Sequence, residues 1–345
     1  MNYKCILSVC LASLALTACK TKQPAASNAV TAEALMKEIQ LQATVQQKLT
    51  YGHLPSASGI ELVNETYYIV GDDSPYLYEL DAEYKLAQRH VLFDTADFSS
   101  GRIPKPLKPD LEGMAHFIYG RDQLLLLIGS GSSDMRNRAF VVNVTDNMQV
   151  KELDFSRLYT FLKRVLHLRT EGELNLEGFA MDETYTYIMQ RAIGIGSNVL
   201  FRFDTEAFKD FLINDGDIPA AAVYHFALSK LEGYGAGFSG AYALQDKLFF
   251  TASVEDAPNA IEDGEVVGSL VGMIDLNRLP YATDAANPLQ VPTVQLMNPD
   301  GSVYTGKAES LVVKAGEGSS YQLVVVSDDD QGGSELLEIE LEVEE

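Results

Sequence analysis

The sequence predicts an all-β protein folded as a β-propeller of five four-stranded blades. Three observations carry this prediction. A motif of a small or acidic residue followed by Gly or Ser recurs about every sixty residues, each motif opens a series of short β-forming runs, and the last series lacks one run that the start of the domain supplies. Regular recurrence of one unit is typical of radial arrays. The motifs are Ser58-Gly59, Glu112-Gly113, Glu177-Gly178, Ser239-Gly240 and Glu309-Ser310.

Runs of β-forming residues separated by turn residues follow each motif. The first four units each supply four runs, whereas the fifth supplies three before the chain ends. An alternating segment at 41–49 belongs to no unit, and we expect it to complete the last blade and close the ring. Six blades are the alternative, because 95–109 or 214–237 could contain an irregular blade. In the first unit the runs are 58–62, 67–70, 76–80 and 88–93.

Two helical segments interrupt the strands. Residues 155–168 place apolar side chains on one helical face after Asp154, a predicted N-cap, and a shorter helix is expected at 206–213 after Asp204-Thr205. We expect both to decorate one rim of the propeller. The first either roofs the axial cavity or packs on a blade.

The N-terminus has the pattern of an exported lipoprotein. Residues 1–18 combine Lys4 with an apolar stretch too short to span a bilayer, as in a signal peptide. Leu16-Thr17-Ala18-Cys19 resembles the bacterial lipobox, which implies lipidation of Cys19; the alternative is an ordinary signal peptide with an unrelated Cys. Residues 19–36 are expected to form a flexible tether, and 37–345 a single domain.

This pattern predicts a location in the cell envelope. The absence of Asp after Cys19 favours a lipid anchor in the outer membrane, facing the periplasm or the cell surface. No cysteine follows Cys19, which excludes disulfides, thiolate metal sites and a Cys nucleophile from the domain. With 49 acidic and 26 basic residues and a net charge of −23, nucleic acid is excluded as a partner.

The first residue of each motif is a candidate functional position. In a propeller the inner strands line the axis, so Ser58, Glu112, Glu177, Ser239 and Glu309 would form a ring at one channel mouth. Converging carboxylates need a cation, a basic partner, backbone donors or a raised pKa. Oxygen ligands favour a hard ion, so we predict Ca²⁺ held by the three ring glutamates. The alternative is that these glutamates accept hydrogen bonds from adjacent blades.

Further charged residues are predicted near the same mouth. Asp72 and Asp328 follow second strands that ring closure makes neighbours, and Arg191 and Lys307 add positive charge. These four are the predicted contacts to a small polar or phosphorylated ligand; the alternative is that the Asp residues cap tight turns. Other cationic residues expected near these ends are Arg138, Arg202, His53 and His116.

Three longer segments contain the glutamate motifs: Asp110-Leu111-Glu112-Gly113-Met114-Ala115, Asn175-Leu176-Glu177-Gly178-Phe179-Ala180 and Lys307-Ala308-Glu309-Ser310-Leu311 with Val326-Ser327-Asp328-Asp329-Asp330. These segments resemble the repeats of bacterial phytase-like and esterase-like β-propeller proteins. The resemblance covers residues from about 49 to 341 and implies the propeller fold and calcium-dependent phosphoester hydrolysis. In such a reaction Glu177 or Glu112 would act as general base beside a metal-bound water. Ser58 and Ser239 depart from a complete multi-metal ring. The alternative is a non-catalytic module whose helices contact another envelope protein.

Overall fold

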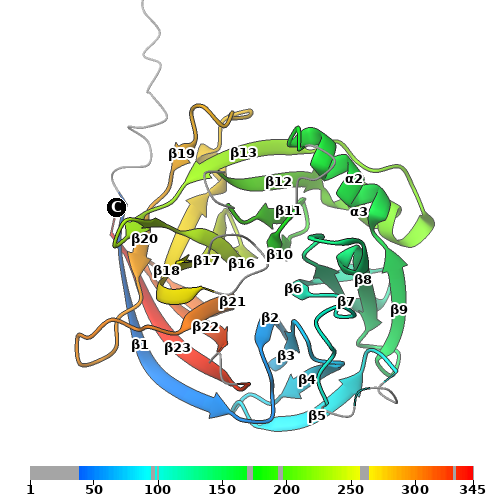
Figure 1. The fold of residues 1–345 in the computed structure, drawn as a ribbon, viewed down its shortest axis with the longest axis horizontal. Helices are drawn as coiled ribbons and strands as arrows, with labels where there is room; N and C mark the ends of the chain where they lie inside the picture. The colour runs from blue at the N-terminus through cyan, green and yellow to red at the C-terminus, as the bar shows by residue number, and fades with distance from the viewer. Residues whose placement is uncertain are drawn as a thin grey trace, which may run out of the picture.

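The structure, a computed structural model, contains five sheets of four or five strands arranged around a common axis, and one small two-stranded sheet (Figure 1). It describes residues 39–94, 98, 101–168, 174–192, 197–256, 264–328 and 332–344. The predicted five-bladed propeller is therefore confirmed. The predicted lipidation site Cys19 and the tether up to residue 36 lie outside the described residues. Among those described, no helix has the length and apolar character needed to cross a bilayer.

Each blade begins with a strand at the axis and adds strands outward (Figure 1). The first blade contains β2 (Ala57–Val63), β3 (Thr66–Gly71), β4 (Tyr76–Leu80) and β5 (Leu86–Val91). The second contains β6 (Leu111–Tyr119), β7 (Asp122–Gly129), β8 (Arg138–Asn143) and β9 (Gln149–Asp154). The third contains β10 (Leu176–Met181), β11 (Tyr185–Gln190), β12 (Asn198–Asp204), β13 (Ala222–Ala227) and the two-residue β19 (Leu289–Gln290). The fourth contains β16 (Gly237–Leu244), β17 (Lys247–Asp256), β18 (Glu265–Asp275) and β20 (Thr293–Gln295).

The fifth blade is completed by the N-terminal strand, as predicted. Strands β21 (Lys307–Glu317), β22 (Ser320–Asp328) and β23 (Ser334–Glu344) are followed by β1 (Gln40–Tyr51) at the outer edge. β1 pairs antiparallel with β23 along its length, from Gln40 opposite Glu344 to Tyr51 opposite Ser334. This pairing joins the two ends of the domain and protects the edge of β23.

A β-bulge recurs at the same point of every blade. In each inner strand the pairing register shifts across the first residue of the sequence motif. The residue skipped by the ladder is re-aimed relative to its neighbours, which is what bulges do beside functional sites. The five skipped residues are Ser58, Glu112, Glu177, Ser239 and Glu309.

The second residue of the motif is small because adjacent inner strands approach closely. A Cβ added at Gly113 would lie 2.6 Å from the Cβ of Phe179 in the third blade. One added at Gly240 would lie 2.6 Å from both the carbonyl oxygen of Glu309 and the Cα of Ser310 in the fifth blade. Side chains at these positions would therefore push the blades apart.

The two helices pack between blades rather than over the axis. α2 (Ser156–Val165) buries Leu158, Tyr159 and Leu162 in a core that also contains α3 (Thr205–Asn214), and Figure 1 shows both near the outer rim. Asp204 caps α3 by accepting from the Ala207 N–H at 2.9 Å. Asp154 was predicted as the N-cap of α2, but the N-cap is the next residue, Phe155. Asp154 accepts a hydrogen bond from the backbone N–H of Ser156.

No sixth blade occurs in the described part of the two long stretches considered for one. The described residues between β5 and β6 contain no strand. The stretch 214–237 contains β13 and the small hairpin of β14 (Lys230–Leu231) and β15 (Tyr234–Gly235). The chain in both stretches therefore connects blades instead of adding one.

A candidate ligand site at the channel mouth

The ring positions divide into two chemical types. Ser58 Oγ donates to the carbonyl oxygen of Leu111 at 2.5 Å, and Ser239 Oγ donates to that of Ala308 at 2.7 Å. Each serine thus links its blade to the residue just before the ring position of another blade. Glu177 and Glu309 are buried and Glu112 is partly buried.

One group of charged residues surrounds Glu309. Lys307 Nζ lies 3.0 Å from Glu309 Oε1 and 3.4 Å from Glu255 Oε1. Arg191 Nη2 lies 2.8 Å from the same Glu255 oxygen, and its Nη1 donates to Ser253 at 2.8 Å. The structure therefore brings Arg191, Lys307 and Glu309 together through Glu255, a residue that sequence reasoning missed.

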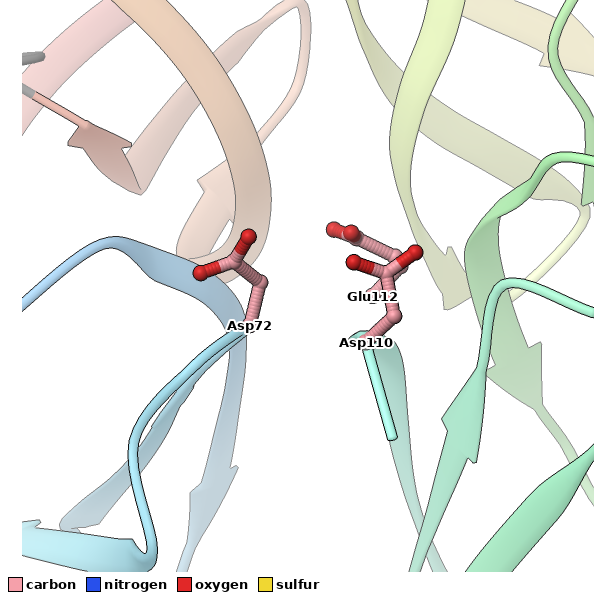
Figure 2. A group of neighbouring side chains, drawn as sticks. All are labelled: Asp72, Asp110 and Glu112. Carbon is pink, nitrogen blue, oxygen red and sulfur yellow. The ribbon is translucent and has the colours of Figure 1, made fainter. Parts of the chain in front are cut away.

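A second group surrounds Asp110 at the start of the second blade. Lys108 Nζ contacts Asp72 and lies 2.7 Å from Asp110 Oδ1, while Arg136 Nη1 lies 2.6 Å from Asp110 Oδ2. Carboxylate oxygens of Asp72, Asp110 and Glu112 lie within 4.8 Å of one another, and Figure 2 shows them extending toward one space from two blades. This triad has the composition of a hard-cation site.

The triad differs from the predicted metal ligands. Of Glu112, Glu177 and Glu309, only Glu112 belongs to it; Asp72 was predicted as a ligand contact and Asp110 was not predicted. The ammonium group of Lys108 already lies against two of the three carboxylates. A metal ion at this point must therefore compete with a positive charge that the chain itself supplies.

Burial raises the pKa of every ring glutamate. It raises the pKa of Glu177 to about 7 and that of Glu309 to about 8, although nearby basic groups oppose the change. For Glu112, burial and then the nearby Glu177 and Asp110 raise the pKa well above its usual value. Arg191 and Lys307 lower the pKa of Glu255 against the effect of burial. Burial thus favours the protonated form of the ring acids, which reduces their mutual repulsion, whereas Arg191 and Lys307 favour the ionised form of Glu255.

A cavity of about 260 Å³ opens beside these groups, and we call it the mouth pocket. Ring residues Ser58 and Glu309 lie in its wall, with loops of the first and fifth blades and the connection between β5 and β6. Three of the four predicted ligand contacts, Asp72, Asp328 and Lys307, line it, whereas Arg191 is not among the lining residues and pairs with Glu255. The binding role of all four stays a prediction. Its charged lining residues are Arg102, Lys105, Lys108, Lys307, Asp72, Asp73, Glu309 and Asp328.

Sequence reasoning missed the basic residues of the connection between β5 and β6. Arg102, Lys105 and Lys108 are far along the chain from Ser58-Gly59, the motif of the first blade. Only the fold places them in one pocket wall with loops of the first and fifth blades. A usable signal was present, because three basic residues occur within seven positions of an otherwise acidic chain just before Asp110. They lie at the entry to the second blade, where ring residues are also found.

The other cationic residues expected near the mouth do not line the pocket. The guanidinium of Arg202 lies over the rings of Tyr185 and Tyr224, at 4.5 and 5.2 Å from their centroids. Arg138 pairs with Glu152 at 2.6 Å. His53 contacts the Tyr51 ring, and the backbone N–H of His116 donates to Glu61. These residues stabilise blades and loops instead.

A family model described as "Family of unknown function (DUF6929)" matches residues 53–341. The chain belongs to the DUF6929 family. A comparison with curated proteins finds no match. The description of the family names neither a phytase nor an esterase, so the narrower resemblance stays a prediction, while the propeller that it implies is confirmed.

Solved structures resemble this DUF6929 chain in fold. Glutaminyl cyclase of Myxococcus xanthus is 12% identical, with 90% of this chain and 100% of that chain covered and a TM-score of 0.47. An arabinanase of Bacillus subtilis is 10% identical over 84% and 95%, with a TM-score of 0.43. Virginiamycin B lyase of Staphylococcus aureus is 10% identical over 87% and 99%, with a TM-score of 0.33. These values carry no argument about activity.

Proposed function

We propose that this protein is an envelope-anchored propeller that binds a small polar ligand in the mouth pocket. The observation that supports this proposal is the pocket itself, a cavity of about 260 Å³ lined by charged residues of the first and fifth blades and of the connection between β5 and β6. Structural ion pairs alone do not require such a cavity. Polar groups that converge on a concave site are the usual basis of ligand specificity.

Binding is tested by thermal unfolding of the full chain with a panel of sugars, sugar phosphates and amino acids. We expect at least one compound to raise the melting temperature, because a ligand that binds only the folded state stabilises it. Lys105→Ala, in the pocket wall, should reduce that shift, whereas the matched control Lys151→Ala on the exposed β9 should not. A panel without effect, or equal shifts in both variants, would contradict the proposal.

The anchor in this proposal is a lipid on Cys19. The lipobox-like Leu16-Thr17-Ala18-Cys19 and the polar segment that follows support it. Cys19→Ser should transfer the protein from the membrane fraction to the soluble fraction, whereas Cys10→Ser, within the signal-like stretch, should leave its distribution unchanged. Membrane association that survives Cys19→Ser would contradict lipid anchoring.

Hydrolysis of a phosphoester with Ca²⁺ is the catalytic version of the proposal. Asp72, Asp110 and Glu112 are the residues that would hold the ion, which would supply a polarising charge and an activated water. Glu177, with its pKa raised by burial to about 7, has the proton affinity of a general acid or base near neutral pH. The chemistry of these carboxyl groups supports phosphoester hydrolysis; the substrate that carries the phosphoester is left open.

Release of inorganic phosphate from a simple phosphomonoester tests this version. We expect release to depend on Ca²⁺ and to be lost with a chelator and in Glu112→Gln. Glu152→Gln, which neutralises a carboxylate on the outer strand β9, is the control. If phosphate is not released at any Ca²⁺ concentration, the hydrolytic version fails and ligand binding without catalysis remains.

A further inference from the structure

Three residues that line the mouth pocket each have a side-chain oxygen that lacks a hydrogen-bond partner. Asp72 Oδ1, Asp73 Oδ1 and Glu309 Oε2 are buried and unpartnered within the described residues, where they are three of six such side-chain atoms. All three belong to pocket-lining residues, and the Glu309 side chain is only 7% exposed. Buried polar atoms are normally hydrogen-bonded, so their concentration at one cavity indicates a missing partner.

The basic groups of the pocket are already engaged. Lys108 contacts Asp72 and Asp110, and Lys307 contacts Glu309 and Glu255. Arg102 Nη2 lies 2.6 Å from Asp73 Oδ2, and Lys105 also has an interaction partner. An anionic ligand must compete with these internal carboxylates for the basic groups. The carboxyl oxygens that lack a partner instead favour a ligand that donates hydrogen bonds.

The charge and size of the pocket narrow the ligand further. Four basic and four acidic residues line it, so its wall has no strong preference for either sign of charge. About 260 Å³ is far more than the roughly 10–15 Å³ that one water needs, and therefore more than a bare ion fills. A hydroxyl group both donates and accepts hydrogen bonds. It can therefore pair with ionised Asp72 and Asp73 and with Glu309 in either protonation state.

We propose that the mouth pocket binds a neutral polyhydroxylated molecule, a sugar or cyclitol, through hydroxyl groups that pair with Asp72 Oδ1, Asp73 Oδ1 and Glu309 Oε2. The turn after β3 supplies the first two oxygens and the inner strand β21 supplies the third. The inference rests on the proposed function and narrows its ligand from polar molecules in general to polyols.

The test compares polyols with charged probes on the full chain. Saturation-transfer NMR with D-xylose, D-glucose and myo-inositol should show contact with at least one of them, and titration then gives its affinity. Asp73→Asn keeps an oxygen for Arg102 but replaces the unpartnered oxygen by a donor, so we expect affinity to fall by about tenfold or more. Asp73→Ala should have the same effect. Asp215→Asn changes another aspartate that pairs with an arginine, outside the pocket, and should have none.

Inorganic phosphate, Ca²⁺ and putrescine are the competing probes. If the site binds phosphate instead, Asp73→Asn removes a negative charge beside Arg102 and should tighten phosphate binding, which is the opposite sign. Binding of any charged probe without binding of a polyol would overturn this inference but leave a ligand site at the mouth. Absence of binding by all six probes would overturn both the inference and the proposed function.

Discussion

Glu112 is the ring glutamate that the chain compensates least. Its carboxyl group faces those of Asp72 and Asp110, and the basic groups nearby contact those two instead (Figure 2). Glu177, by comparison, accepts from Asn175 at 2.5 Å, and Glu309 contacts Lys307. The raised pKa of Glu112 follows from burial and this arrangement, so an ionised Glu112 costs stability.

Glu112→Gln should therefore stabilise the protein at pH 8 and leave it unchanged at pH 5. At pH 8 the unfolded chain favours the ionised form of Glu112, whereas its position in the fold favours the neutral form. Folding therefore costs free energy that Gln, which is neutral at every pH, does not cost. The expected effect at pH 8 is a higher free energy of unfolding for the variant than for the wild type. Denaturant unfolding at both pH values measures it, with Glu340→Gln on the exposed face of β23 as control. Equal stability of variant and wild type at pH 8 would show that Glu112 is not strained.

Arg191→Met should destabilise the protein by about 3–5 kcal/mol. Arg191 is the closest cation to the largely buried Glu255, whose side chain is 10% exposed, and removing it leaves that charge with Lys307 at 3.4 Å. The double variant Arg191→Met with Glu255→Gln should recover much of the loss, because no uncompensated charge remains. Thermal unfolding of both variants measures the effect. A double variant no more stable than the single one would mean that Arg191 acts by packing rather than by charge.

Among the elements, the inner strands show most clearly what the sequence encodes. The repeated motif predicted their start, and the structure adds that its first residue occupies a bulge and its second a point of close contact between blades. The sequence could not show the bulge, because one skipped residue alters the pairing without altering composition. The outer strands matched less closely: predicted 88–93 is Leu86–Val91, since exposed edge strands carry a weaker apolar pattern.

Gly240→Ala should destabilise the protein by at least about 1–3 kcal/mol, the usual cost of overpacking a core. The atoms that an added methyl would meet are backbone atoms of Glu309 and Ser310, which cannot rotate away. Gly235→Ala, in the small hairpin, meets no atom within 4 Å and is the matched control. Denaturant unfolding measures both. A Gly240→Ala variant as stable as the control would mean that the blades can separate at no cost.

At the scale of the whole molecule, ring closure depends on β1. Removing residues 1–51 exposes the edge of β23 and uncovers side chains that pack against β1, so we expect aggregation or loss of cooperative unfolding. Removing residues 1–37 retains the whole of β1 and should leave unfolding cooperative. Size-exclusion chromatography and thermal unfolding distinguish the two. A monomeric, cooperatively unfolding chain without β1 would show that closure is dispensable.

The protonated ring also predicts how the stability of the molecule depends on pH. The folded-state pKa values of Glu177 and Glu309, about 7 and 8, lie above the ordinary value of 4.5. The folded state therefore holds protons that the unfolded state has lost, and stability must fall as pH rises from about 6.5 to 8.5. Below pH 6.5, His116 and His225 oppose this trend, because burial lowers their pKa. A melting temperature that rises over pH 6.5–8.5 would contradict the protonated ring.

The sequence by itself determined the repeat, the blade count, the closing strand and the ring of Ser and Glu, because each depends on local patterning or on counting units. Tertiary structure decided the neighbours of those residues. Lys108 and Glu255 reach the ring from a connection and a strand end that carry no periodic signal. Asp110 opens a repeat segment, but the sequence does not show that it pairs with Lys108 and Arg136. Their proximity arises when the blades close around the axis, and it decides which acids have a basic partner and which residues line the mouth pocket.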